Sequence, residues 1–200
     1  PAEYLIVEVS PALRAQQQQT LAGQIEQNPV KVRWLDTLPE SGFRGVILAN
    51  EVLDAMPVIR FRVAAEGHMT AGVVERNGHL DWSWKRDLAQ NGRIDRLVKQ
   101  YGLVADYTSE VNPSAAAWMQ TVGRLLDTGL ILVMDYGYPG AEYYHPERSD
   151  GTLMCHYQHR AHMDPFLYPG LQDLTAHVDF SAIAAAGQVA GLDIAGFTSQ

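Results

Sequence analysis

The sequence predicts an α/β fold built on a mostly parallel, doubly wound sheet. Three short runs with a strand pattern each end at an acid or an amide. The runs are residues 4–7 before Glu8, residues 30–35 closing on Asp36, and residues 46–49 before Asn50. The run at 46–49 is unbroken and apolar, which is typical of a strand covered on both faces. A helical pattern separates the first two runs, and strand, helix, strand is the rhythm of such a sheet.

Helix signals support this order of elements. Ser10 is a favoured N-cap and Pro11 is favoured at the first helical position, so a helix is expected over residues 11–21. Apolar residues at helical spacing predict a second helix over residues 114–126. The apolar run 129–134 predicts another buried strand, which delivers Asp135 and Tyr136. Asp179 is expected to cap a last helix through residue 189, and residues 192–197 would form a final strand.

Between residues 58 and 108 the pattern changes to alternation of apolar and polar residues. Alternating runs at 58–63, 69–75 and 80–84 predict antiparallel strands. Asn77-Gly78 lies between two of them and is a strong hairpin signal. Trp82 and Trp84 share one face of a strand, where packing is the favoured interpretation. We therefore expect a β-rich insertion with a polar, helical connector at residues 86–101.

These patterns divide the chain into three parts. Residues 1–57 and 109–200 form the two parts of a Rossmann-like domain, and residues 58–108 are the insertion and connector. The second part includes a long loop at 138–178, and connections of that length are usually functional or disordered. Its composition is not that of a disordered segment, since it holds five of the seven histidines and five tyrosines.

Histidines are common metal ligands, and the long loop is rich in them. His156, His159 and His162 fall three residues apart, but no acid or cysteine completes a recognisable zinc pattern. Hydrogen-bonded or solvated histidines are therefore the favoured interpretation, and no metal is expected.

Composition bounds the class of protein. The chain has 200 residues, of which 46% are hydrophobic, and this indicates a globular core. It holds no apolar run of the roughly 20 residues that cross a bilayer. Acids outnumber bases by 23 to 15, which argues against a nucleic-acid partner and fits a cationic or neutral substrate or a basic protein segment. The single cysteine, Cys155, cannot form an internal disulfide and fits a reducing compartment.

The strand ends carry the candidate chemistry. Ligands of open α/β sheets bind beyond the carboxyl ends of the strands, where Asn50, Glu51 and Asp54 follow residues 46–49. The alternative is an ordinary helix cap with exposed acids. Glu8 is placed like an acceptor for ribose hydroxyls, and Asp36 like an acceptor for an adenine amine. The sequence contains no glycine-rich phosphate loop and no Gly-x-Ser-x-Gly elbow.

Several segments resemble a known family. Residues 49–58, Ala-Asn-Glu-Val-Leu-Asp-Ala-Met-Pro-Val, closely resemble a block of the MidA-like S-adenosylmethionine-dependent methyltransferases. Residues 135–137, 142–153 and 169–180 are similar to later blocks of that family, in the same order. Residues 4–11 are similar to the segment around its second strand.

The resemblance implies the class I methyltransferase sheet, a Rossmann-like α/β sandwich, with S-adenosyl-L-methionine as cofactor. The family's glycine-rich first motif, on a central strand before Tyr4, is not among these residues. Because the chain opens on a strand pattern without an initiator Met, we expect it to belong to a longer chain. The first strand would then lie outside this sequence or come from another chain, and a complete central strand formed by these residues would refute that expectation.

The resemblance also implies roles for individual residues. The cofactor-binding residues would be Glu8 at the ribose, Leu35 and Asp36 at the adenine, and Asn50 and Glu51 at the methionine end. The substrate-binding residues would be Asp135, Tyr136 and Asp173, and the catalytic residues would be Glu51, Asp54 and His177. The alternative for residues 173–177 is a capped, self-bonded loop before the last helix.

We therefore expect methylation of a nitrogen, and specifically of a protein arginine. The mitochondrial branch of the family methylates an arginine of a partner subunit during assembly of respiratory complex I. The alternatives are a non-catalytic assembly scaffold that keeps the cofactor fold and a small-molecule methyltransferase. Asn50, Glu51 and Asp54 favour an enzyme, since docking alone needs no buried acids. The expected compartment is the bacterial cytoplasm, or the mitochondrial matrix in a eukaryote, and the sequence gives no oligomeric state.

Overall fold

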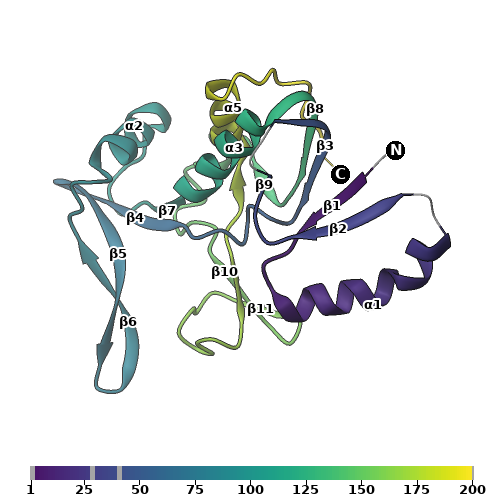
Figure 1. Ribbon diagram of the computed structural model, residues 1–200. Helices are drawn as coiled ribbons and strands as arrows, with labels where there is room; N and C mark the ends of the chain where they lie inside the picture. Colours follow the sequence, from purple (N-terminus) through teal and green to yellow (C-terminus); the bar gives the residue numbers. More distant parts are fainter. Residues whose placement is uncertain (1–2, 28–29, 40–41, 200) are drawn as a thin grey trace. The chain divides into compact units, whose positions relative to one another are not determined.

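The computed structural model describes residues 3–27, 30–39 and 42–199. The chain divides into two compact units, Pro1–Phe43 and Arg44–Gln200, which are described separately (Figure 1). No helix among the described residues is long and apolar enough to cross a membrane.

The first unit consists of two parallel strands and one helix. β1 (Glu3–Val7) pairs with β2 (Lys31–Leu35) so that Val7 lies opposite Leu35. α1 (Pro11–Gln27) connects them and begins at the predicted proline. Ser10 caps it weakly, since its Oγ accepts the N–H of Leu13 at 3.4 Å. The predicted strand, helix, strand order is confirmed for this unit.

The helix packs loosely on these strands. α1 has no buried residue. A groove of about 520 Å³ lies between the helix and the strands, and its lining is mostly apolar, with Tyr4, Ile6, Leu21, Ile25 and Val32 among its residues. This lining offers no charged group for chemistry.

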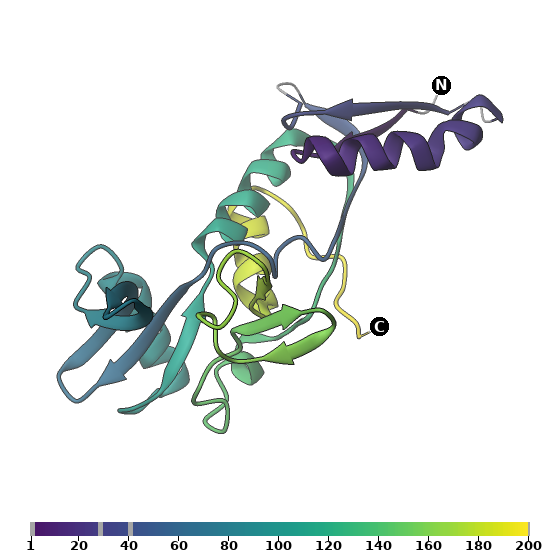
Figure 2. The same cartoon turned by 90° about the horizontal axis from the view of Figure 1, so that it is seen from below.

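The second unit contains another parallel pair. β3 (Phe43–Asn50) and β8 (Leu126–Met134) form a two-stranded sheet. They run in the same direction, because a Cβ on Gly129 would overlap the backbone of Gly45, while Glu51 N–H donates to Met134 O at 2.9 Å. α3 (Pro113–Leu125) and α5 (Phe180–Val189) lie side by side in both views (Figures 1 and 2).

The expectation that these two strands are covered on both faces is wrong for the described residues. The exposed fractions are 63% for Val46, 55% for Leu48, 45% for Leu130 and 44% for Leu132. Exposure alternates along β3, so its side chains are covered on one face of the pair only.

The antiparallel strands predicted after residue 58 are confirmed, and they form a sheet in the order β6-β5-β4-β7. Its strands are β4 (Ile59–Ala64), β5 (Gly67–Arg76), β6 (His79–Lys85) and β7 (Thr108–Val111). Asn77 and Gly78 form the hairpin turn with φ of 53° and 81°, as their dipeptide predicts. α2 (Asn91–Tyr101) follows the hairpin. The buried core of this region includes Phe61, Val63, Ile94, Leu103, Tyr107, Val111, Tyr143 and Tyr144.

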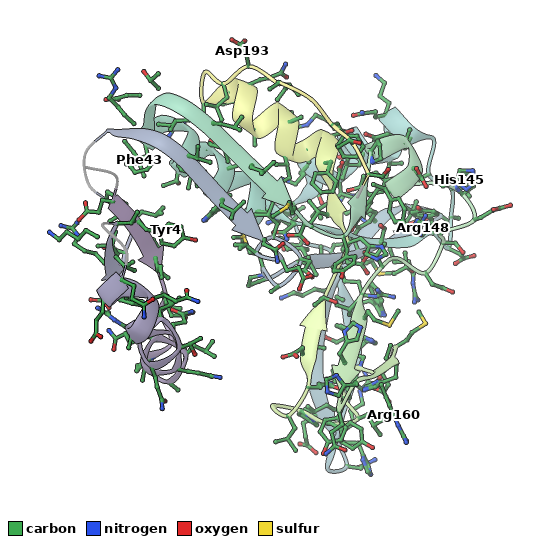
Figure 3. All side chains as sticks on the ribbon, turned by 90° about the vertical axis from the view of Figure 1, so that its right-hand side faces the viewer. Tyr4, Phe43, His145, Arg148, Arg160 and Asp193 are labelled. Atoms are coloured by element: carbon green, nitrogen blue, oxygen red, sulfur yellow. The ribbon has the colours of Figure 1, made fainter. Side chains whose placement is uncertain are left out.

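The long loop is more regular than its sequence indicates. It contains β9 (Gly137–Tyr138), α4 (Gly140–Tyr143), β10 (Met154–Tyr157), β11 (Arg160–His162), β12 (Asp173–Thr175) and β13 (Val178–Asp179). Three of these strands form a sheet in the order β11-β10-β12, and Arg160 lies near its end (Figure 3). These elements are two to four residues long, too short for a hydrophobic period to reveal.

The expected strand over residues 192–197 is wrong, because that segment has no regular structure. α5 ends in a turn at Gly191, whose φ is 89°, and Leu192 N–H donates to Gly187 O at 3.0 Å. Phe197 packs on the Phe180 ring at a centroid distance of 5.3 Å instead of entering a ladder. The predicted cap is confirmed at the other end of the helix, where Asp179 accepts the N–H of Ala182.

Candidate active site

The segment after β3 is a tight loop fixed by the tip of β8. Asp135 Oδ2 accepts the backbone N–H groups of Val52, Leu53 and Asp54 at 3.2, 2.8 and 3.4 Å. Successive N–H groups that converge on one oxygen form a concave anion site, here occupied by a side chain of the neighbouring strand. The backbone of this loop is therefore held in one conformation by Asp135.

Glu51 begins the loop in a strained backbone conformation. Its φ is 49°, in the left-handed region that non-glycine residues enter at a cost of about 1–2 kcal/mol. Its N–H donates to Met134 O, so the pairing of β3 with β8 continues through this residue and maintains the strain. Such strain gathers at functional sites, and the Glu51 side chain is exposed.

Asp54 carries a buried acid that lacks a cationic partner. The residue is 8% exposed, and no Lys, Arg or His in the described chain forms an ion pair with it. Burial raises the pKa of the Asp54 carboxyl, and the nearby Asp135 and Glu51 carboxylates raise it further. A cation placed beside this group would relieve both effects.

Asn112 holds the same loop from the start of α3. Its Oδ1 accepts the N–H of Ala115 at 2.8 Å and so caps the helix. Its Nδ2 donates to Leu53 O at 3.1 Å and to Met56 O at 3.4 Å. Our site prediction did not include this residue, although an Asn directly before a Pro at the first helical position is a sequence signal for a cap.

His177 joins the site through the backbone of the residue before it. Ala176 N–H donates to Asp54 O at 3.0 Å. The imidazole is half-buried and meets the Tyr138 ring edge-on at 5.1 Å, and the Arg148 guanidinium lies 4.2 Å from the centroid of that ring. Burial and Arg148 lower the pKa of His177, so the ring is neutral at neutral pH.

The structure gathers the predicted catalytic residues more closely than the predicted substrate-binding ones. Glu51 and Asp54 share one loop with the Asp135 carboxylate, and His177 follows a residue bonded to that loop. Asp135 Oδ1 accepts the N–H of Tyr136 at 2.9 Å, so both of its oxygens bind backbone. Tyr136 is 60% exposed. Asp173 is exposed on β12, and substrate binding by these three residues stays a prediction.

The first unit places the other predicted cofactor residues at one end of its two strands. Glu8 Oε1 accepts the N–H of Ser10 at 2.8 Å, and its Oε2 accepts Nε2 of Gln17 at 3.0 Å. Asp36, after Leu35, is paired with Arg14 at 2.5 Å. Each carboxylate keeps free lone pairs, so acceptors at the ends of parallel strands fit ribose hydroxyls and an adenine amine.

The loop histidines do not gather with acids or cysteines. Within residues 3–27, 30–39 and 42–199, no three His, Cys, Asp or Glu side chains form a metal-binding group. His162 instead lies against the Tyr168 ring at a centroid distance of 5.9 Å, and Tyr168 stacks on Tyr157 at 4.2 Å.

Comparison with known families decides the assignment. Residues 1–198 match the family described as "Putative S-adenosyl-L-methionine-dependent methyltransferase". The chain belongs to this family. The resemblance drawn from residues 49–58 is therefore confirmed, and so is the cofactor class that it implies.

Two curated relatives are mitochondrial proteins. The "Protein arginine methyltransferase NDUFAF7 homolog, mitochondrial" of Caenorhabditis elegans is 28% identical over 163 residues, which cover 78% of this chain and 36% of that protein. The human "Protein arginine methyltransferase NDUFAF7, mitochondrial" is 30% identical over 149 residues, covering 72% and 32%. The chain thus spans well under half the length of these relatives.

Two solved structures from Burkholderia thailandensis are more similar. One, bound to S-adenosyl-homocysteine, has a TM-score of 0.86 and 45% identity over 94% of this chain and 48% of that one. A native structure has a TM-score of 0.88 and 46% identity over 99% and 52%. This similarity confirms the class I methyltransferase fold.

Proposed function

We propose that this protein is an S-adenosylmethionine-dependent methyltransferase that methylates a nitrogen of a protein arginine. The observation that carries the proposal is the buried Asp54 carboxylate, which has no cationic partner in the described chain and lies on the same loop as the strained Glu51. Membership of a methyltransferase family supports the reaction class. The names of the mitochondrial relatives support arginine as the acceptor.

The described residues fit the cofactor in two groups. S-adenosylmethionine, when bound, supplies a methyl group already activated on a sulfonium. Glu8 would hold the ribose hydroxyls, and Leu35 and Asp36 would border the adenine. Asn50 and Glu51 would hold the methionine end. None of these residues has to activate the donor, so their work is binding and orientation.

The acids suit an arginine side chain. A guanidinium remains protonated at neutral pH and presents a planar fork of N–H donors, which carboxylates bind in a bidentate manner. Glu51 and Asp54 would bind and orient this guanidinium and polarise it toward one of its nitrogens. The Asp54 position adds an electrostatic reason, since a bound cation restores the ionised carboxylate that burial and Asp135 disfavour.

A proton must leave the guanidinium nitrogen that is methylated. We assign its acceptance to the His177 imidazole, which is neutral at neutral pH because burial lowers its pKa. The Nδ1 atom of His177 is buried and has no hydrogen-bond partner among the described residues, so no protein group there fixes which ring nitrogen carries the proton. Asp173, which the family resemblance assigns to substrate binding, is the second candidate for this proton.

The biological setting is part of the proposal. The family resemblance implies a subunit of respiratory complex I as the protein substrate. We place the protein in a bacterial cytoplasm, because the Burkholderia structures are 45–46% identical and the mitochondrial relatives 28–30%. The formal net charge of −8 argues against a nucleic-acid acceptor, and membrane insertion is not expected.

Transfer of labelled methyl groups tests the proposal. Full-length protein would be incubated with methyl-labelled S-adenosylmethionine and an extract of source cells that lack the gene, and the extract would then be hydrolysed to amino acids. We expect labelled N-methylarginine in the protein fraction. Label confined to small molecules would establish a small-molecule methyltransferase, and cofactor binding without any transfer would establish a non-catalytic scaffold.

A further inference from the structure

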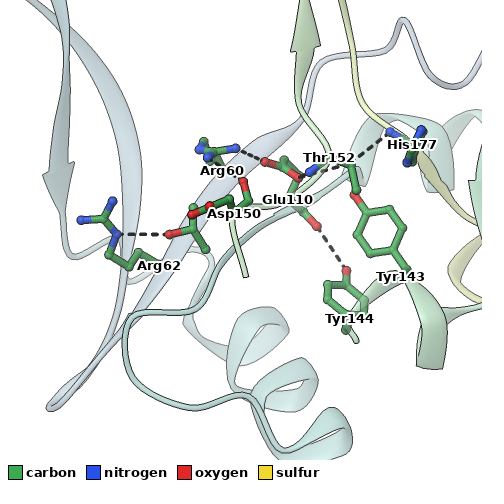
Figure 4. A network of polar contacts seen from close by, with 9 residues as sticks. Arg60, Arg62, Glu110, Tyr143, Tyr144, Asp150, Thr152 and His177 are labelled. Atoms are coloured by element: carbon green, nitrogen blue, oxygen red, sulfur yellow. Dashed lines mark hydrogen bonds and ion pairs between the residues drawn. The ribbon is translucent and has the colours of Figure 1, made fainter. Parts of the chain in front are cut away.

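A second acid, Glu110 on β7, is completely buried, and both of its carboxylate oxygens have bonding partners (Figure 4). Arg60 lies opposite it in the antiparallel register of β4 and β7, and Arg60 Nη1 forms an ion pair with Glu110 Oε1. Tyr144 donates its hydroxyl to Glu110 O at 3.2 Å. Burial raises the pKa of the Glu110 carboxyl, against the opposing effect of Arg60 and Thr152.

Arg60 and Glu110 both form hydrogen bonds with residues 150–152 of the long loop. Arg60 Nη2 donates to Asp150 O at 2.8 Å. Glu110 Oε2 accepts the N–H of Thr152 at 2.8 Å and its hydroxyl at 3.3 Å. Gly151 between them has φ of 78°, and a Cβ there would lie 2.6 Å from Glu110 Oε2. The carboxylate therefore lies directly against the backbone, where only glycine fits.

Thr152 passes this constraint on to His177. The Thr152 hydroxyl donates to Glu110 Oε2 and accepts the backbone N–H of His177 at 3.1 Å. The Tyr143 hydroxyl oxygen lies 3.2 Å from Thr152 Oγ1, and it is the donor there because the Thr152 proton is directed to Glu110. One donor and two acceptor positions are thus all used, which fixes the orientation of the hydroxyl (Figure 4).

Stability alone does not account for this arrangement. A buried ion pair is often no more stabilising than well-packed apolar side chains of the same volume, since desolvation offsets the attraction. A fully bonded carboxylate does specify geometry, because each bond has a preferred length and direction. The network ends at the backbone N–H of the residue to which we assign proton transfer.

We propose that Glu110, fixed by Arg60, acts through Thr152 as a positioning residue that sets the place of the His177 imidazole. The catalytic consequence rests on the proposed function, in which His177 accepts a proton. The positioning itself does not rest on the proposed function, because it can be measured by titration of the His177 ring without any turnover.

Substitution of the shared hydroxyl tests this inference. Thr152→Val removes the hydroxyl and keeps the side-chain shape and the N–H bond to Glu110, whereas Thr152→Ser restores the hydroxyl. Thr121→Val is the matched control, because the Thr121 hydroxyl also donates a hydrogen bond, to Ala117 O, but lies on an exposed part of α3. Glu110→Gln is an independent variant that weakens the same contact from its other side.

The first readout is the titration of the His177 ring by NMR in the full-length protein with labelled histidine, assigned by its loss in His177→Gln. We expect the lowered pKa of His177 to rise toward the ordinary value of about 6.5 in Thr152→Val and Glu110→Gln. Thr152→Ser and Thr121→Val should titrate like the natural protein. The second readout is methyl transfer, where kcat should fall by about tenfold or more in Thr152→Val and KM for S-adenosylmethionine should stay within about twofold.

The outcomes separate this inference from the proposed function. An unchanged His177 pKa in both folded variants overturns the positioning role. A shifted pKa with reduced transfer supports both proposals. A shifted pKa with unchanged transfer keeps the positioning role, overturns His177 as the proton acceptor, and so removes the catalytic consequence.

Discussion

Glu51 combines an exposed carboxylate with a left-handed backbone, a pairing that the fold maintains at a cost. If its charge orients the guanidinium, Glu51→Gln should lower turnover by about 10- to 100-fold, because a hydrogen bond to a charged group contributes about 1.5–3 kcal/mol. Cofactor affinity measured by calorimetry should fall much less than turnover, although Glu51 is also assigned to the methionine end of the cofactor. Glu26→Gln, at an exposed position of α1, serves as the control. Equal losses of turnover and affinity would make Glu51 a cofactor ligand only.

Asp54 illustrates a conflict between stability and function at one residue. Its folded-state pKa is raised above 3.8, so the folded protein binds the proton more tightly than the unfolded chain does. The resulting stabilisation is complete below 3.8 and is lost as the pH rises through the raised pKa. At neutral pH the ionised, buried carboxylate therefore lowers the free energy of unfolding.

Asp54→Asn should consequently raise the free energy of unfolding at pH 7 while it abolishes most of the methyl transfer. The gain in stability should shrink as the pH falls toward 4, because the natural side chain becomes neutral there. Urea denaturation across this pH range measures the effect. A variant that is less stable at pH 7, or a gain that does not depend on pH, would contradict it.

At the scale of elements, the contact between Glu110 and residues 150–152 requires the Glu110 carboxylate to lie directly against the backbone of Gly151, which has no side chain in the way. Gly151 and Gly170 have nearly the same φ, 78° and 77°, but a Cβ at Gly170 would meet no atom within 4 Å. Gly170→Ala should therefore cost only the backbone strain, about 1 kcal/mol. Gly151→Ala should cost about 3 kcal/mol or more, because its methyl group also displaces the Glu110 carboxylate. Equal losses in thermal or urea denaturation would show that the carboxylate can move aside.

The elements also show which parts of the fold the sequence could predict. The helix after Asn112 and the hairpin at Asn77-Gly78 rest on local chemistry, a cap and a left-handed turn, so the pattern alone predicts them. Strands β10 to β12 pair only because the loop folds back on itself, and such tertiary pairing leaves no period in a run of three or four residues. The strand expected over residues 192–197 has apolar residues but pairs with no strand in the part of the chain that the structure describes.

Some residues of the candidate site could likewise be predicted from the sequence, and others could not. Glu51 and Asp54 could be found because they follow a recognisable strand. The contact between Arg60 and Glu110 depends on the register of β4 against β7, two strands that are 50 residues apart in sequence. Thr152 and Asn112 act through backbone carbonyls and N–H groups, whose positions no pattern of side chains reports.

At the scale of the whole molecule, the two compact units hold different groups of the predicted residues. The first unit contributes acceptors at the ends of β1 and β2, with Glu8 bonded to Ser10 and Gln17. The second contributes the acids of the loop after β3 and the imidazole of His177. Under the proposed function, the first group serves only cofactor binding and the second group serves mainly turnover, so variants in the two units should have different kinetic signatures.

Glu8→Gln tests this division from the cofactor side. The substitution keeps the length of the side chain and removes the charge that strengthens hydrogen bonds from ribose hydroxyls, which contribute about 1.5–3 kcal/mol when the acceptor is ionised. The Kd for S-adenosylmethionine should therefore rise by about tenfold or more, while turnover at saturating cofactor stays close to that of the natural protein. Glu3→Gln is the control on the same strand, because Glu3 lies at the opposite end of β1 and pairs with Arg33 at 3.1 Å. Calorimetry on the full-length protein gives the affinity directly, and an unchanged Kd in Glu8→Gln would remove the ribose assignment without affecting the acids of the second unit.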